Sequence, residues 1–152
     1  TTGRTSRTST GKAVRVLFDT NVILDVLLAR APHAAPATTL LDFVARKALD
    51  GWLGATTLTT IFYLVGRATT AAQARRHVST LLDLFEIAPV TRPILAEALE
   101  PGFKDYEDAV LHAAARQAGA TAIVTRDPAG FTGSRLRIYG PAELLRLVRA
   151  AQ

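Results

Sequence analysis

Apolar residues along the chain follow two alternating patterns, short continuous runs and longer stretches with helical spacing. Short runs rich in β-branched residues predict strands, and the longer amphipathic stretches predict helices. The predicted strands are AVRVLFD (13–19), WLGATT (52–57), EIAPV (86–90), TAIVTRD (121–127) and RLRIYG (135–140). The main predicted helices cover 21–30, 36–48, 58–68, 70–85 and 106–119, and a last helix starts at Pro141.

This alternation predicts an α/β fold with a central, mostly parallel sheet that helices cover on both faces. In such sheets, ligands bind beyond the carboxyl ends of the strands. Asp19 and Asp127 each follow one of the two strands that are most clearly predicted to be central. The sequence therefore places two carboxylates at the edge of the sheet where a ligand is expected.

Two further carboxylates, Asp105 and Asp108, lie three residues apart at the start of the helix over 106–119, hence on one helix face. A cluster of like charges is costly unless cations neutralise it, and hard oxygen ligands favour Mg²⁺ or Mn²⁺. Such an ion activates water for attack on a phosphodiester. Each acid alone also fits a structural role as a helix cap or turn residue, so only their joint placement indicates a site.

Four segments together resemble PIN domains, and most closely the bacterial branch that includes the VapC-type toxins. These segments are FDTNVILDVLL (18–28), TLTTIFYLVGR (57–67), FKDYEDAVLHAAA (103–115) and AIVTRD (122–127). The resemblance covers residues 14–145 and implies a PIN-like three-layer α/β/α sandwich. It also implies a Mg²⁺- or Mn²⁺-dependent endoribonuclease, the toxin of a type II toxin–antitoxin pair, with RNA as substrate and a cognate antitoxin as partner.

Carried over by position, the resemblance makes Asp19, Asp108 and Asp127 the metal ligands. It makes Asp105 a fourth catalytic contributor. Three further residues are expected to support the acids. These are Asn21, which would orient Asp19, Thr125, which would hydrogen-bond the cluster or its water, and Arg126, the best candidate for a phosphate contact.

One departure from the family pattern concerns the helix after the second strand, where many PIN nucleases carry a glutamate. No acid occurs here between Asp50 and Asp83, so a water, Thr57 or Thr60, or Asp105 would have to substitute. This lack supports an alternative, a weak or inactive PIN module that binds RNA or a protein partner. A receiver-like phosphoryl-transfer domain is a weaker option, because the paired acids after the first strand are missing.

The formal charge of +5 changes this picture little. The first twelve residues contain three basic side chains and no acid, and without them 15 basic residues face 13 acidic ones. We interpret residues 1–12 as a disordered tail or an expression remnant, and residues 13–152 as the nuclease domain. GRTSRTSTGK does not match a phosphate-binding loop.

Cysteine is absent and no apolar run is long enough to cross a bilayer, which favours a cytoplasmic protein without membrane contact. The apolar face of LTTIFYLVG (58–66) is expected to pack in the core, in a homodimer or against an antitoxin helix. Asp25 and Asp50 are expected on solvated faces or as caps. His112 is expected to be a partly exposed helix residue rather than a ligand.

Overall fold

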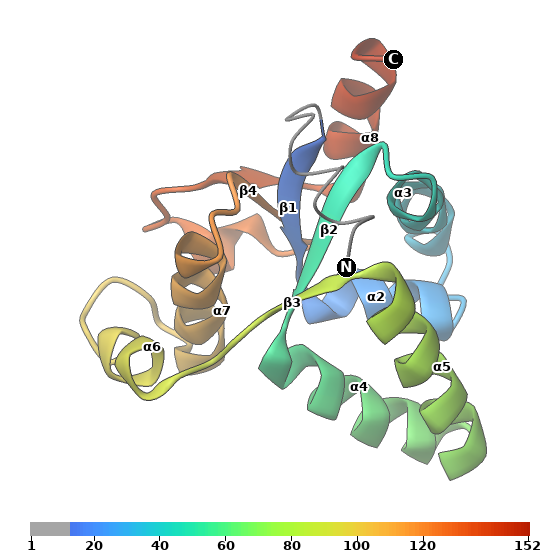
Figure 1. Cartoon of the computed structure of the whole chain (residues 1–152), viewed down its shortest axis with the longest axis horizontal. Helices are drawn as coiled ribbons and strands as arrows, with labels where there is room; N and C mark the ends of the chain where they lie inside the picture. The colour runs from blue at the N-terminus through green and yellow to red at the C-terminus, as the bar shows by residue number, and fades with distance from the viewer. Residues whose placement is uncertain (1–12) are drawn as a thin grey trace.

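The computed structural model describes residues 13–152, so the interpretation of residues 1–12 lies outside the described residues. Five parallel strands form one sheet in the order β3-β2-β1-β4-β5 (Figure 1). The strands are β1 (Val14–Phe18), β2 (Leu49–Gly54), β3 (Glu86–Ala88), β4 (Ala122–Val124) and β5 (Arg137–Tyr139). The predicted α/β class with a parallel sheet is therefore confirmed.

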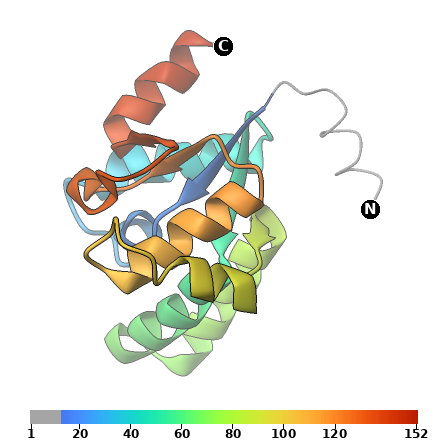
Figure 2. The ribbon, with the colours of Figure 1, turned by 90° about the vertical axis from the view of Figure 1, so that its left-hand side faces the viewer.

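Helices cover both faces of this sheet, which gives the predicted three-layer sandwich (Figures 1 and 2). The helices are α2 (Thr20–Leu27), α3 (Ala34–Ala45), α4 (Ala55–Ala68), α5 (Ala71–Leu84), α6 (Arg92–Glu97), α7 (Tyr106–Gln117) and α8 (Pro141–Ala150). A single 3₁₀ turn, η1 (Pro128–Phe131), follows β4 within the described part of the chain. None of the helices over residues 13–152 has the length and apolar character needed to span a bilayer.

The central strand β1 shows why the sheet is buried on both sides. Val16 and Phe18 belong to one hydrophobic cluster, with α2, α3, α4, α5 and α8, and Leu17 belongs to a second cluster under α6 and α7. Successive side chains of a strand point to opposite faces, so a continuous apolar run supplies both layers of core. All three side chains are fully buried.

The second strand differs from its sequence-based prediction. The strand was expected over 52–57, but Asp50 and Gly51 also lie inside β2, and α4 already begins at Ala55. Gly51 permits close packing here, because a Cβ at this position would lie 2.8 Å from the ring of Phe85 and 2.9 Å from Val44. Asp50 accepts a hydrogen bond from Arg15 of β1 over 3.1 Å and is mostly buried, so the expectation of a solvated Asp50 is wrong.

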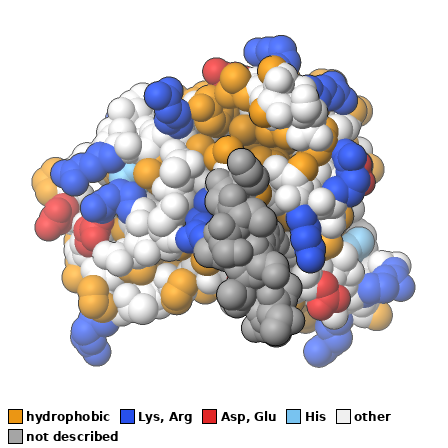
Figure 3. Space-filling model, turned by 45° about the horizontal axis from the view of Figure 1, so that its top comes forward, with side chains coloured by type: hydrophobic (Ala, Val, Ile, Leu, Met, Phe, Trp, Pro, Cys, Tyr) orange, Lys and Arg blue, Asp and Glu red, His pale blue; other side chains and the backbone are white. Residues whose placement is uncertain are grey.

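A hollow lined mostly by apolar side chains lies beside the first residues of β1 and β2, next to α8. It measures about 330 Å³ and includes Val14 and Leu147, which are about half exposed. Figure 3 shows hydrophobic side chains gathered on the face of the molecule seen from this side. Parallel strands all begin at this edge, so the hollow lies away from the carboxyl edge, where the predicted acids are placed.

Candidate active site

The sheet brings the sequence-predicted acids to one edge of the molecule. Asp19 follows β1 directly, and Asp127 follows the neighbouring strand β4 by three residues. Asp105 is the N-cap of α7, and Asp108 lies in the first turn of that helix. Asp105, Asp108 and Asp127 line one pocket of about 570 Å³, together with Gly102, Phe103 and residues of η1.

Gly130 of η1 shows how near two of these carboxylates lie to each other. A Cβ added at Gly130 would lie 2.8 Å from Oδ2 of Asp108 and 3.3 Å from Oδ2 of Asp127. Both oxygens therefore face the same small space, which the missing side chain of Gly130 leaves open. A methyl group in this space would press against both acids.

The electrostatics of the acids show that their charges oppose one another. The pKa of Asp108 is raised to about 7, first by burial and then by the negative charges of Asp19, Asp105 and Asp127, in that order of effect. Burial also raises the pKa of Asp19, although hydrogen bonds from Thr125 and from the backbone of Thr20 lower it in part. Negative charge on these carboxylates is therefore unfavourable in free energy, and a bound cation would remove this cost.

Three donors hold the carboxylate of Asp19 in place. The backbone N–H of Thr20 donates to Oδ1 over 2.7 Å, and the hydroxyl of Thr125 donates to Oδ2 over 2.7 Å. The amide of Asn21 donates to the same Oδ2 over 3.4 Å. Asp19 is thus the N-cap of α2. Its carboxylate is also oriented by two side chains, Asn21 of α2 and Thr125, which follows β4.

Thr125 connects the two strand-end acids. Its hydroxyl donates to Asp19 and accepts a hydrogen bond from the backbone N–H of Asp127 over 3.0 Å, and the residue is fully buried. Asn21 contributes to the same network, because its Oδ1 accepts from the backbone N–H of Arg126 over 3.2 Å. Both residues thus lie where sequence reasoning placed them, in contact with the acids or with their loop.

Asp105 is exposed, as is Asp127, whereas Asp19 is buried. Oδ1 of Asp105 accepts a hydrogen bond from the backbone N–H of Asp108 over 3.0 Å, which is the usual bond of a helix N-cap. Asp105 also lines the acidic pocket. Its carboxylate is therefore open to solvent and to a ligand at the rim of the site.

Arg126 points away from the acids and binds Asp25 of α2. Its Nε and Nη2 donate to the Asp25 carboxylate, the second over 3.2 Å, and Arg30 Nε lies 3.0 Å from Asp25 Oδ1. Asp25 is fully buried, so the expectation that it lies on a solvated face or acts as a cap is wrong. A signal was present, because Asp25 follows Asn21 by four residues and so shares its helix face.

His112 of α7 is also more buried than expected, with 6% of its surface exposed. Its Nε2 accepts a hydrogen bond from the backbone N–H of Arg135 over 3.2 Å, and its ring packs against Phe103. Burial lowers the pKa of His112, and the nearby charge of Arg116 lowers it further. The histidine is therefore neutral, and it lines a different pocket from the acids.

The helix α4 carries no acid, and one of its hydroxyl side chains lies next to the start of α2. Thr57 is buried, and its Oγ1 lies 2.9 Å from Oγ1 of Thr20, the residue that follows Asp19. Thr60 donates to the backbone carbonyl of Thr56 in its own helix over 3.2 Å. Thr57 is thus the α4 side chain that these contacts place next to the start of α2.

The donor set fits a hydrated divalent cation. Within residues 13–152, no three acidic, histidine or cysteine side chains already have the arrangement of a metal-ligand set. Mg²⁺ commonly keeps several waters and is held directly by only one or two carboxylates, so closely gathered acids suffice. The carboxylate oxygens, the space beside Gly130 and the raised pKa of Asp108 all suit such an ion.

Comparison with known proteins assigns the chain to a family. The chain matches the PIN domain over residues 15–129. It therefore belongs to the PIN domain family, and the resemblance noted in the sequence is confirmed. No curated protein matches the chain in sequence.

Several solved structures share the fold at low sequence identity. FitAcB from Neisseria gonorrhoeae is 22% identical with a TM-score of 0.65, over 84% of this chain and 98% of that one. VapBC2 from Rickettsia felis, bound to a fragment of promoter DNA, is 15% identical with a TM-score of 0.65, over 84% and 98%. VapC20 from Mycobacterium tuberculosis, a sarcin–ricin loop cleaving toxin, is 16% identical with a TM-score of 0.57, over 71% and 86%.

Proposed function

We propose that this protein is a Mg²⁺- or Mn²⁺-dependent endoribonuclease and the toxin of a type II toxin–antitoxin pair. The observation that carries the proposal is that Asp108 and Asp127 line one pocket in a PIN domain and that the charge of Asp19, after β1, acts on Asp108. One structural neighbour is a toxin that cleaves the sarcin–ricin loop, and others are VapBC and FitAB complexes. A cytoplasmic location agrees with an RNA substrate.

In this proposal, Asp19, Asp108 and Asp127 hold the cation, directly or through its waters. When bound, the ion supplies an activated water and stabilises negative charge on the phosphodiester. The hydroxyl of Thr125 fixes Oδ2 of Asp19, and Asn21 supports both residues. Asp105, which is exposed and lines the pocket, would accept the proton of the attacking water.

A second candidate function is a PIN module that binds RNA or a protein partner without cutting. The observation that favours it is the absence of any acid in α4, where Thr57 instead bonds Thr20. Three acids line the pocket in spite of this loss, and the charge of Asp19 acts on one of them, Asp108, so we favour the nuclease. The production of new RNA ends distinguishes the two candidate functions.

An antitoxin is the proposed protein partner, since several neighbours are toxin–antitoxin complexes. The paired helices α4 and α5 carry exposed apolar side chains, with Tyr63 59% and Leu82 47% exposed. An amphipathic antitoxin helix would bury such a surface. The same surface also suits a homodimer.

Cleavage of total RNA with sequencing of the new ends tests the proposed function. Under single-turnover conditions, the protein should produce discrete ends with Mg²⁺ or Mn²⁺ and none with EDTA, because the acids need a cation to act on a phosphodiester. Ends that form equally well in EDTA would contradict the proposal. Retention of RNA without any new ends would favour the binding module.

A further inference from the structure

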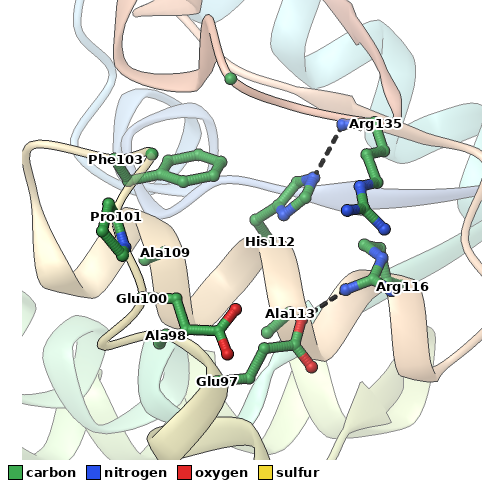
Figure 4. A pocket seen from close by; sticks show the side chains of 12 residues that line it. Glu97, Ala98, Glu100, Pro101, Phe103, Ala109, His112, Ala113, Arg116 and Arg135 are labelled. Atoms are coloured by element: carbon green, nitrogen blue, oxygen red, sulfur yellow. Dashed lines mark hydrogen bonds and ion pairs between the residues drawn. The ribbon is translucent and has the colours of Figure 1, made fainter.

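A second pocket opens beside the acidic pocket and is separate from the acids. It measures about 360 Å³ and lies between α6, the connection from α6 to α7, and the loop before β5 (Figure 4). Gly102 and Phe103 line both pockets, so the two spaces adjoin.

One face of α7 forms the floor of this second pocket. Ala109, His112, Ala113 and Arg116 follow one another at helical spacing and all line it. Asp105 and Asp108 lie at the beginning of the same helix, one turn before His112. The helix thus holds the two pockets at a fixed separation.

The walls of the second pocket combine an aromatic ring with hydrogen-bonding groups of both kinds. The ring of Phe103 lies 4.9 Å from that of His112, and Glu97 forms an ion pair with Arg116 (Figure 4). Within the part of the chain that the structure describes, the side chains of Glu100 and Arg135 have no hydrogen bond or ion pair. One acceptor group and one donor group therefore remain available to a ligand.

His112 adds a second donor to this set. Its Nε2 accepts a hydrogen bond from the backbone of Arg135, so this nitrogen carries no proton. Because the ring is neutral, the proton is on Nδ1, which has no partner among residues 13–152. The tautomer follows from the hydrogen bond that fixes the other nitrogen.

The chemistry of these walls fits a nucleobase better than an ion. Two carboxylates and two guanidinium groups leave no net charge, which disfavours a free phosphate or a metal cation. Unpaired RNA bases are recognised by stacking on aromatic rings and by hydrogen bonds to their edges. The volume also lies in the range of small-ligand pockets, which is roughly 300–1,000 Å³.

Guanine matches the available groups best among the four bases. Its N1–H and N2–H₂ are adjacent donors that one carboxylate can accept together, and its O6 and N7 are adjacent acceptors for a guanidinium group. Adenine offers no N1–H, and the pyrimidines lack N7. Glu100 is the acceptor that remains available for the two donors, and Arg135 is the donor available for O6 and N7.

We infer that this second pocket binds an unstacked guanine of the RNA strand, next to the phosphodiester that lies at the acids. The inference rests on the proposed ribonuclease function and names the base that directs it. Phe103, Glu100 and Arg135 are then specificity residues. RNA ends produced by the protein should be enriched in guanine at one fixed position beside the cut.

Titration with the four nucleoside monophosphates tests the pocket without any cleavage. In metal-free protein with EDTA, followed by NMR or calorimetry, GMP should bind about tenfold more tightly than AMP, CMP or UMP. The variant Glu100→Gln should lose this preference, and the charge-matched variant Asp83→Asn, on exposed α5, should keep it. Removing a negative charge would strengthen general attraction of an anion, so weaker GMP binding in Glu100→Gln identifies a specific contact.

Equal binding of GMP and AMP, or unchanged GMP binding in Glu100→Gln, would overturn the guanine pocket. End mapping keeps this outcome apart from the proposed function. RNA ends that form only with metal but show no guanine enrichment would support the nuclease function and refute the guanine pocket. Selective GMP binding without any RNA cleavage would support the guanine pocket and refute the nuclease function.

Discussion

Asp108→Asn is expected to lower metal-dependent RNA cleavage by about a thousandfold or more. The substitution keeps the size of the side chain and removes a carboxylate that shares the space beside Gly130 with Asp127. Single-turnover cleavage of an RNA that the wild-type protein cuts measures the effect. Asp83→Asn removes the same charge from exposed α5 and should cleave at the wild-type rate.

The fold of the Asp108→Asn variant should remain intact. In the metal-free protein, burial and the charge of Asp19 raise the pKa of Asp108 to about 7, so its negative charge is unfavourable in the folded state. A neutral amide removes this unfavourable charge, and thermal unfolding should occur at the same temperature or higher. Cleavage at the wild-type rate by a folded variant would contradict the assignment of Asp108.

Asp25→Ala is expected to lower the free energy of unfolding by about 2–4 kcal/mol. The buried carboxylate binds both Arg126 and Arg30, and its loss leaves two guanidinium groups without a partner. The side chains of Arg126 and Arg30 are 31% and 42% exposed, so water compensates part of the loss and the effect stays below that of a fully buried pair. Urea denaturation measures the change.

A matched control exists in the ion pair between Asp42 and Arg46, where both side chains are more than half exposed. Asp42→Ala should change the free energy of unfolding by less than about 0.5 kcal/mol, because exposed pairs contribute little. If Asp25→Ala proved as stable as Asp42→Ala, the structural role of Asp25 would be refuted.

Asp25 also matters for the acids, although it does not touch them. Arg126 lies between Thr125 and Asp127, and its bond to Asp25 fixes the loop that carries both residues. Loosening this loop should weaken metal binding by roughly ten- to a hundredfold, as expected for groups that orient ligands. This network explains why Arg126 faces α2 rather than the pocket.

Local patterns in the sequence were sufficient to predict the parallel sheet and the edge of the sheet at which the acids lie. The strands before Asp19 and Asp127 carry an apolar residue at every buried position, and continuous apolar runs of this kind occur in strands buried on both faces. Parallel strands end at one edge, so the two acids had to lie near each other. The three-residue spacing of Asp105 and Asp108 likewise predicted that both lie on one face of their helix.

The misinterpreted residues have partners far away in sequence. Asp25 pairs with Arg126, 101 positions later, and Asp50 pairs with Arg15, 35 positions earlier. Asp50-Gly51 has strong turn propensity, but packing of Phe85 and Val44 against Gly51 stabilises a strand instead. His112 is buried because the loop before β5 covers α7, and no local pattern shows that contact.

Calorimetric titration of the metal-free protein with Mn²⁺ shows whether the acids bind a divalent cation. Binding should be saturable, Asp108→Asn should abolish it, and Asp83→Asn should retain it. Affinity should also rise between about pH 6 and about pH 8, because protons compete with the metal for Asp108, whose pKa is about 7. Absence of binding at millimolar Mn²⁺, or equal binding by Asp108→Asn, would contradict the metal site and the nuclease built on it.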